Sequence, residues 1–284
     1  MTYDFELLAS GFGTIEGPTV DAEGTLYFSD VFQGGVFRLA ADGGVTTVVP
    51  KRKGVAGITL HRDGGIIVSG RDLSHVKDGE SRTVLRPDAL PERGGAPVTG
   101  FQDMTADAAG RLFAGTVRTN EDRHQVPGEL VMIDTDGTVT LPYHIAHPNG
   151  ITFSAGEQML FHADSFRRSL LVSRVDDSGV PRLEREISTL DCPGVPDGMA
   201  GDEEGLIWIA FYDGGQIVRM SPNGEVVERI PAPAREVTNL CFGGRDGREL
   251  YVTTGNNDAD PGLGGCVFRA RTPIPGKIAP SATV

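Results

Sequence analysis

Short runs of alternating hydrophobic and polar residues, separated by turns that contain glycine, recur along the whole chain. Each copy has a few alternating residues, a polar turn, and then a strand of β-branched or aromatic residues. Alternation with a period of two on both sides of a glycine turn is typical of a β-hairpin. Six copies occur, with their turn positions at Gly24, Gly64, Gly110, Glu157, Gly205 and Gly247.

The spacing of these turns predicts the fold. Successive turn positions are 40, 46, 47, 48 and 42 residues apart, and a period of about 40 to 50 residues with four short strands is typical of one β-propeller blade. Second hairpins around Gly43, Gly137 and Gly224 supply outer strands. We therefore predict an all-β, six-bladed β-propeller over residues 1–284 as a single domain. Six unrelated hairpins in a sandwich are the alternative, and the regular spacing disfavours them.

The sixth copy lacks a good fourth strand, because Pro273, Pro275 and Pro280 follow its third strand. An open propeller would expose sheet edges that promote aggregation. We therefore expect the N-terminal segment 3–9 to pair with the last blade and close the ring.

The register of the repeat predicts a central site, because the innermost strands of a propeller converge on one channel. The positions eight residues before each turn position, here called the ring positions, are Glu16, Ala56, Gln102, Asn149, Asp197 and Asn239. Five of these six side chains carry oxygen, and burying each unpaired amide costs roughly 1–3 kcal/mol. A hard divalent cation would satisfy them. The alternative is that each one caps a strand end, as Asn and Asp often do in loops.

Oxygen ligands favour Ca²⁺ as this cation, with Mg²⁺, Mn²⁺ or Zn²⁺ as alternatives. The absence of His and Cys from the ring argues against a high-affinity structural zinc site.

Composition excludes several other classes of function. With 26 Lys and Arg against 39 Asp and Glu, the formal net charge is −13, so a nucleic acid partner is disfavoured. No apolar run approaches the roughly 18 residues of a membrane helix, and the first residues do not resemble a signal peptide. We expect a cytoplasmic protein with no membrane partner. The three cysteines have no CxxC spacing, which predicts reduced, buried thiols.

Four phrases carry a resemblance to a known family: Ile15-Glu16-Gly17-Pro18, residues 102–111 (QDMTADAAGR), His147-Pro148-Asn149-Gly150-Ile151 and Pro196-Asp197-Gly198-Met199. In this order, and in successive blades, they resemble the senescence-marker-protein, gluconolactonase and luciferin-regenerating-enzyme superfamily, which includes regucalcin.

The resemblance implies one divalent cation in the central channel, held by Glu16, Asn149 and Asp197. It also implies that Asp197 is both a ligand and the proton acceptor. Gln102 would contact the substrate or the attacking water, and its neighbours Phe101 and Asp103 are further candidate substrate contacts.

One segment departs from the family pattern. Sugar-lactone members have Arg-x-Asn-Asp where this chain has Gly100-Phe101-Gln102-Asp103. Glycine cannot donate hydrogen bonds from a side chain to substrate hydroxyls, which disfavours a polyhydroxylated lactone. Phe101 and Met104 favour a less polar substrate.

The resulting hypothesis is a metal-dependent lactonase, in which the ion polarises the carbonyl of a cyclic ester and activates water while Asp197 accepts the proton. Three alternatives stay open: a non-catalytic calcium-binding or ligand-binding propeller, hydrolysis of another ester or a phosphotriester at the same site, and a protein-interaction scaffold. Asp164 and Tyr212 are weaker candidates for substrate contacts. His144 and His147 are a candidate dyad that could act as an alternative base. The expected ligand is a small lactone or ester, and no oligomeric state is predicted.

Overall fold

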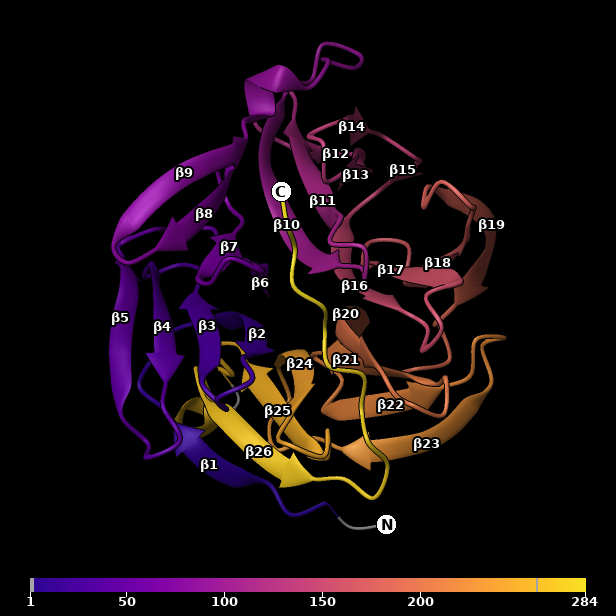
Figure 1. Cartoon of the computed structure of the whole chain (residues 1–284). Helices are drawn as coiled ribbons and strands as arrows, with labels where there is room; N and C mark the ends of the chain where they lie inside the picture. The colour runs from indigo at the N-terminus through magenta and orange to yellow at the C-terminus, as the bar shows by residue number, and fades with distance from the viewer. Residues whose placement is uncertain (1–2, 259) are drawn as a thin grey trace.

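The chain forms a ring of six β-sheets around a central channel, as seen in a computed structural model that describes residues 3–258 and 260–284 (Figure 1). Each sheet is one blade, and each has at least four strands in antiparallel order. The predicted six-bladed β-propeller is confirmed.

The first three blades follow one another along the chain. Blade 1 contains β2 (Ile15–Val20), β3 (Leu26–Asp30), β4 (Gly35–Leu39) and β5 (Val45–Pro50). Blade 2 contains β6 (Ile58–Leu60), β7 (Ile66–Val68), β8 (Leu73–Lys77) and β9 (Glu80–Leu85). Blade 3 contains β10 (Val98–Ala106), β11 (Leu112–Thr119), β13 (Gly128–Ile133) and β14 (Val139–Thr140), with the short strands β12 (Gln125–Val126) and β15 (His144–Ile145).

The other three blades complete the ring. Blade 4 contains β16 (Pro148–Phe153), β17 (Met159–Asp164), β18 (Ser169–Val175) and β19 (Pro181–Ser188). Blade 5 contains β20 (Val195–Gly201), β21 (Ile207–Tyr212), β22 (Gln216–Met220) and β23 (Val226–Pro231). Blade 6 contains β24 (Val237–Gly243), β25 (Glu249–Thr254), β26 (Val267–Arg271) and β1 (Glu6–Ala9). Two single-turn 3₁₀ helices, η1 (Pro87–Ala89) and η2 (Pro261–Leu263), lie in loops.

The N-terminal strand closes the ring as predicted. β1 pairs with β26, and Leu7 lies opposite Phe268. An ion pair between Glu6 and Arg269, with 2.7 Å between nitrogen and oxygen, adds to this contact at the surface. The edge of blade 6 is therefore covered by the same chain.

The six predicted turn positions all have a left-handed backbone. Glu157, where the other copies have glycine, has a φ of 55°, and Gly24 has a φ of 84°. These turns define one face of the ring, here called the hairpin face. The opposite face, where the inner strands begin, is called the site face.

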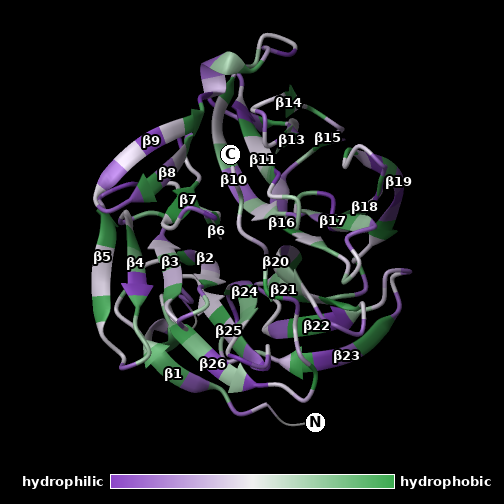
Figure 2. Cartoon of the chain, viewed as in Figure 1, coloured by the Kyte–Doolittle hydropathy of each residue, from purple (hydrophilic) through white to green (hydrophobic). Residues whose placement is uncertain are grey.

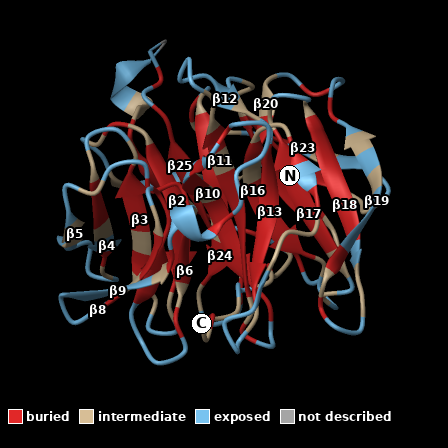
Figure 3. Cartoon of the chain, turned by 90° about the horizontal axis from the view of Figure 1, so that it is seen from above, coloured by how far each residue is buried: buried red, intermediate tan, exposed pale blue. Residues whose placement is uncertain are grey.

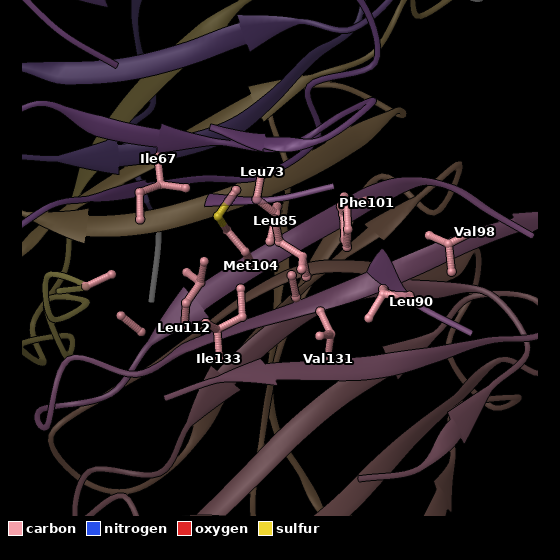
Figure 4. Close-up of a cluster of buried hydrophobic side chains, with 13 residues drawn as sticks. Ile67, Leu73, Leu85, Leu90, Val98, Phe101, Met104, Leu112, Val131 and Ile133 are labelled. Atoms are coloured by element: carbon pink, nitrogen blue, oxygen red, sulfur yellow. The ribbon is translucent and has the colours of Figure 1, made fainter. Parts of the chain in front are cut away.

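Burial decreases from the inner strands to the outer strands. The inner strands β2, β10, β16 and β24 are almost wholly buried, whereas β5 and β19 are mostly exposed (Figure 3). The outer strands β9 and β23 carry both hydrophilic and hydrophobic residues (Figure 2). The hydrophobic core is therefore divided among clusters between neighbouring blades. Figure 4 shows the cluster between blades 2 and 3. The cysteines are free thiols, as predicted, with Cys192 and Cys266 buried and Cys241 half-buried.

The C-terminal tail crosses the channel at the hairpin face (Figure 1). Its backbone bonds to three inner strands or their turns: Lys277 N–H donates to Gly201, Ala282 N–H to Leu60 and Thr283 N–H to Gly110. A ligand would therefore reach the channel from the site face. Among the described residues, no helix has the length and apolar character needed to cross a membrane.

Close approach of neighbouring inner strands requires residues without a side chain. A Cβ on Gly57 of blade 2 would lie 2.7 Å from the Met104 backbone nitrogen of blade 3. A Cβ on Gly150 of blade 4 would lie 2.4 Å from the Asp197 carbonyl oxygen of blade 5. Larger residues at these positions would separate the blades at the channel.

We predict that Gly57→Ala lowers the free energy of unfolding by roughly 1–3 kcal/mol, because the added methyl group meets backbone that cannot move away. Gly156→Ala is the matched control, since a Cβ there has nothing within 4 Å, and it should change stability by less than about 0.5 kcal/mol. Denaturant unfolding of both variants measures the difference. Equal stabilities would show that the inner strands are not closely packed at Gly57.

Candidate functional site

The residues predicted to face the channel lie at irregularities shared by the inner strands. In five blades the pairing of the inner strand shifts register at or beside the predicted ring position, in the segments Glu16–Thr19, Phe101–Met104, Pro148–Ile151, Pro196–Met199 and Val237–Asn239. In blade 2, β6 begins only after Ala56. A bulge leaves residues unpaired and changes the direction of a side chain. The repeated bulge therefore explains why polar side chains appear at the start of otherwise apolar strands.

Three carboxylates meet in the buried centre of the ring. Glu16, Asp103 and Asp197 are at most 8% exposed. Burial and the neighbouring charges of Asp197 and Asp103 raise the pKa of Glu16 well above its usual range. Burial and the charge of Asp103 raise the pKa of Asp197 in the same way, and burial raises the pKa of Asp103 to about 7. The three groups come from blades 1, 3 and 5, so only ring closure brings them together.

Two amides contact these carboxylates. The Asn239 Nδ2 donates to Glu16 Oε2 at 3.1 Å and to Asp103 Oδ2 at 3.0 Å. A hydrogen bond from the Asn149 side chain partly lowers the pKa of Asp197. Asn149 Nδ2 also donates to Ser165 Oγ at 3.2 Å, and this hydroxyl donates to the Pro196 carbonyl at 2.7 Å. Ser165 thus holds Asn149 against blade 5.

The donor set fits a divalent cation. Asp197 Oδ1 is buried and has no hydrogen-bond partner among the described residues, and an unpaired buried charge is costly unless a cation or proton compensates it. Carboxylate and amide oxygens are the ligands that Ca²⁺ takes. No group of three or more His, Cys, Asp or Glu in the described part of the chain is arranged as a metal site by itself. The expected ligand set, two carboxylates and the Asn149 amide, is not of the kind covered by that statement and stays a prediction.

A small cavity of about 70 Å³ lies in the channel. Asp103 and Asn239 contribute to its lining, as do Lys277 and Ile278 of the C-terminal tail. The tail therefore bounds the space that adjoins the carboxylates.

Phe101 does not line the channel cavity, whereas Met104 is among its lining residues. Phe101 is 1% exposed and packs with Leu73 and Leu85 in the core between blades 2 and 3, where Met104 also lies (Figure 4). The register shift between Phe101 and Met104 interrupts the regular alternation of β10 here, so the core packing of Phe101, and not its place in the strand, shows that its side chain lies between the blades. The burial of Phe101 disfavours a direct contact between its side chain and a substrate, and with it the argument from Phe101 for a less polar substrate.

Gln102 and Asp103 differ in their surroundings. Gln102 is half-buried at the ring position of blade 3. Asp103 is 5% exposed and bound to Asn239. Its placement gives more support for a role in the carboxylate cluster than for the expected role as an open substrate contact.

Glycine at position 100 has a local cause. The backbones of Gly70 and Phe101 form a two-way bridge, with Phe101 N–H donating to the Gly70 carbonyl at 2.7 Å. A Cβ on Gly100 would lie 2.9 Å from that same oxygen. The close contact between blades 2 and 3 therefore excludes an arginine at this position with the present backbone.

The weaker candidates lie outside the cluster. Asp164 is fully buried and accepts hydrogen bonds from the N–H groups of Ala146, His147 and Arg167, so it stabilises loops. Tyr212 donates to Glu236 at 3.0 Å. His144 Nδ1 lies 3.5 Å from Glu129, a partner outside the ring positions.

The fold and the central site define a six-bladed propeller with a carboxylate-rich channel. Residues 14–256 match the family described as SMP-30/Gluconolactonase/LRE-like region, so the chain belongs to this family and the predicted resemblance is confirmed.

Two curated relatives are lactonases by name. A pentonolactonase of Haloferax volcanii is 33% identical over 256 residues, covering 88% of this chain and 84% of the relative. A 6-deoxy-6-sulfogluconolactonase of Pseudomonas putida is 34% identical over 270 residues, covering 91% and 90%. A crystal structure of regucalcin from Agrobacterium tumefaciens, described as a calcium-binding protein, has a TM-score of 0.85 at 23% identity, covering 100% of this chain and 99% of that one. This last likeness shows the shared fold.

We predict that Asp103→Asn stabilises the metal-free protein at pH 8. A carboxylate whose pKa is raised on folding from 3.8 to about 7 disfavours the folded state once it is ionised, so this cost is absent near pH 4, grows as the pH rises, and is fully present above pH 7. Removing the charge should raise the free energy of unfolding by roughly 4 kcal/mol at pH 8, because each pKa unit corresponds to about 1.4 kcal/mol, and by less than half of that at pH 5.

Urea unfolding of both proteins in the presence of a chelator, at the two pH values, measures this difference. Equal stabilities at pH 8 would mean that Asp103 is not desolvated beside the other carboxylates.

Proposed function

We propose that this protein is a divalent-metal-dependent lactonase whose active site is the carboxylate cluster in the central channel. The observation that carries the proposal is the convergence of Glu16, Asp103 and Asp197, with Asp197 Oδ1 lacking a partner among the described residues. Membership of the family, and two relatives that are lactonases by name, support hydrolysis of a cyclic ester.

Glu16, Asn149 and Asp197 are the proposed ligands of the ion, with Ca²⁺ as the first candidate. They offer two carboxylates and one amide from blades 1, 4 and 5, which suits a hard cation. When bound, such an ion polarises a carbonyl oxygen and lowers the pKa of water.

The protein's own residues have three further tasks in this proposal. Asp197 is the proposed proton acceptor as well as a ligand, as in the family that the chain belongs to, and a general base must lie within hydrogen-bond reach of the attacking water. Ser165 fixes the direction of the Asn149 amide through its hydrogen bond. Gln102, half-buried at the ring position, is the candidate for contact with the substrate.

The substrate is a lactone that enters from the site face, since the tail crosses the hairpin face. Burial of Phe101 removes one argument against a polar substrate, whereas Gly100 still offers no side chain that could donate to substrate hydroxyls. The names of the relatives make sugar lactones the first compounds to test.

We expect hydrolysis of at least one member of a panel of sugar lactones and simple alkyl lactones, measured by pH-stat titration. Chelator should abolish the activity, and added Ca²⁺, Mg²⁺, Mn²⁺ or Zn²⁺ should restore it with different efficiencies. Asp197→Asn should lower kcat by about 100-fold or more, because it removes the proton acceptor. Full turnover in chelator-treated protein would rule out the metal-dependent mechanism.

Glu16→Gln and Asn149→Ala should each weaken binding of Ca²⁺ by about tenfold or more, measured by calorimetric titration of chelator-treated protein. Each change removes one oxygen ligand or its charge. Glu121→Gln, an exposed carboxylate, is the control and should leave the affinity unchanged. Unchanged affinity in both site variants would mean that the ion binds elsewhere.

A non-catalytic calcium-binding propeller is the second candidate. It is favoured by the fold shared with a regucalcin described as calcium-binding, and by Gly100 and Gln102 where sugar-lactone members have Arg and Asn. Tight binding of Ca²⁺ without hydrolysis of lactones, aryl esters or phosphotriesters would select it.

A further inference from the structure

Asn239 connects residues from opposite sides of the channel. It belongs to β24 of blade 6, and its Nδ2 bonds to Glu16 of the adjoining blade 1 and to Asp103 of blade 3, which is three blades away in the ring. We propose that Asn239 is a positioning residue that fixes Glu16 and Asp103 relative to each other and thereby sets the affinity of the site for a divalent cation. This inference rests on the proposed function.

The orientation of the Asn239 amide follows from its hydrogen bonds. Its Oδ1 accepts from the Leu240 N–H at 2.8 Å, and an N–H group can bond only to the amide oxygen, not to the amide NH₂. The NH₂ group must therefore face the carboxylates, at 3.0 Å from Asp103 and 3.1 Å from Glu16. Both of its hydrogens are used by anions.

Asn239 has little freedom to take another position. It is 6% exposed, and a Cβ on Gly198 of blade 5 would lie 2.0 Å from Asn239 Cγ. The side chain thus occupies space that the neighbouring blade leaves empty by having glycine. A rigid donor holds its acceptors in one geometry, whereas a flexible donor would leave them free to separate.

Asp103 is the reason that such a donor is needed. The residue after the ring position is glycine in blades 1, 2, 4 and 5, namely Gly17, Gly57, Gly150 and Gly198, and it is Leu240 in blade 6. Blade 3 alone has a charged side chain at this register. The structure places the resulting third carboxylate beside a neutral donor, which attenuates its repulsion from Glu16 without replacing the cation.

A positioning role and a purely structural role make different predictions. If Asn239 only fills space and satisfies buried groups, its loss lowers stability but leaves the affinity of folded protein for the ion unchanged. If it positions Glu16 and Asp103, the affinity itself falls, and the effect depends on the charge at position 103.

The test measures the dissociation constant of Ca²⁺ by calorimetric titration of chelator-treated protein, well below the unfolding temperature of each variant. Asn239→Leu keeps the approximate size and removes both donors, and Asn239→Ser is the second variant in case leucine prevents folding. We expect the dissociation constant to rise at least tenfold. Asn257→Ala is the matched control. Asn257 is also buried and in blade 6, where its side chain donates to the Asp260 carbonyl at 2.6 Å, so this change should cost stability without changing the affinity.

A double-mutant cycle with Asp103→Asn identifies the partner. The loss of affinity caused by Asn239→Leu should be several-fold smaller in the Asp103→Asn background, because the effects of substitutions at two interacting residues do not add. An unchanged dissociation constant in both Asn239 variants, or an equal fold-change in the two backgrounds, would overturn the inference while leaving the proposed function in place. If the unaltered protein binds no divalent ion at all, that result rules out the proposed metal-dependent function, and the inference about Asn239 is ruled out as well.

Discussion

The rest of the site depends on one electrostatic constraint: three carboxylates share a buried space at the centre of the ring. Each of them is disfavoured in its ionised form because burial removes water, and for Glu16 and Asp197 the neighbouring carboxylates add a repulsive charge. The folded protein tolerates the free-energy cost of burying these carboxylates because six blades, closed by β1, hold the inner strands together at the channel. Buried carboxylates without a positive partner destabilise the folded protein, so a bound cation would stabilise it.

The local chain conformation is adapted to this constraint. Bulges in five inner strands release residues from regular pairing where the polar side chains appear. Glycine follows the ring position in four blades and allows backbones to approach closely, as at Gly150. Blade 3 departs from this pattern at Asp103, and the opposite blade supplies Asn239 as its donor. The repeat determines where the ring positions lie in each blade. The residues that differ between blades, such as Asp103 and Asn239, determine the charge and the hydrogen bonds of the site.

The contact between blades 2 and 3 shows how packing can alter a family motif. Gly100 avoids the Gly70 carbonyl, and Phe101 fills the core between the blades. The sequence motif by itself suggests a change of substrate at these two positions. In the structure, both residues serve the close contact of the two blades, so the substrate preference must be decided by other residues on the site face.

Periodicity alone was sufficient to predict the number of blades and the positions of Glu16, Asn149, Asp197 and Asn239 at the channel, because hydrophobic alternation and turn spacing are local properties. The closing role of the N-terminal segment followed from the prolines after the last strand, which left blade 6 without a fourth strand of its own. The directions of Phe101 and Asp103, the link from Asn239 to both Glu16 and Asp103, and the unpaired Asp197 Oδ1 were decided only by the tertiary structure. These features join residues separated by up to 223 positions, and they depend on bulges and on closure of the ring. A pattern along one strand contains no information about which side chain faces it from the opposite blade.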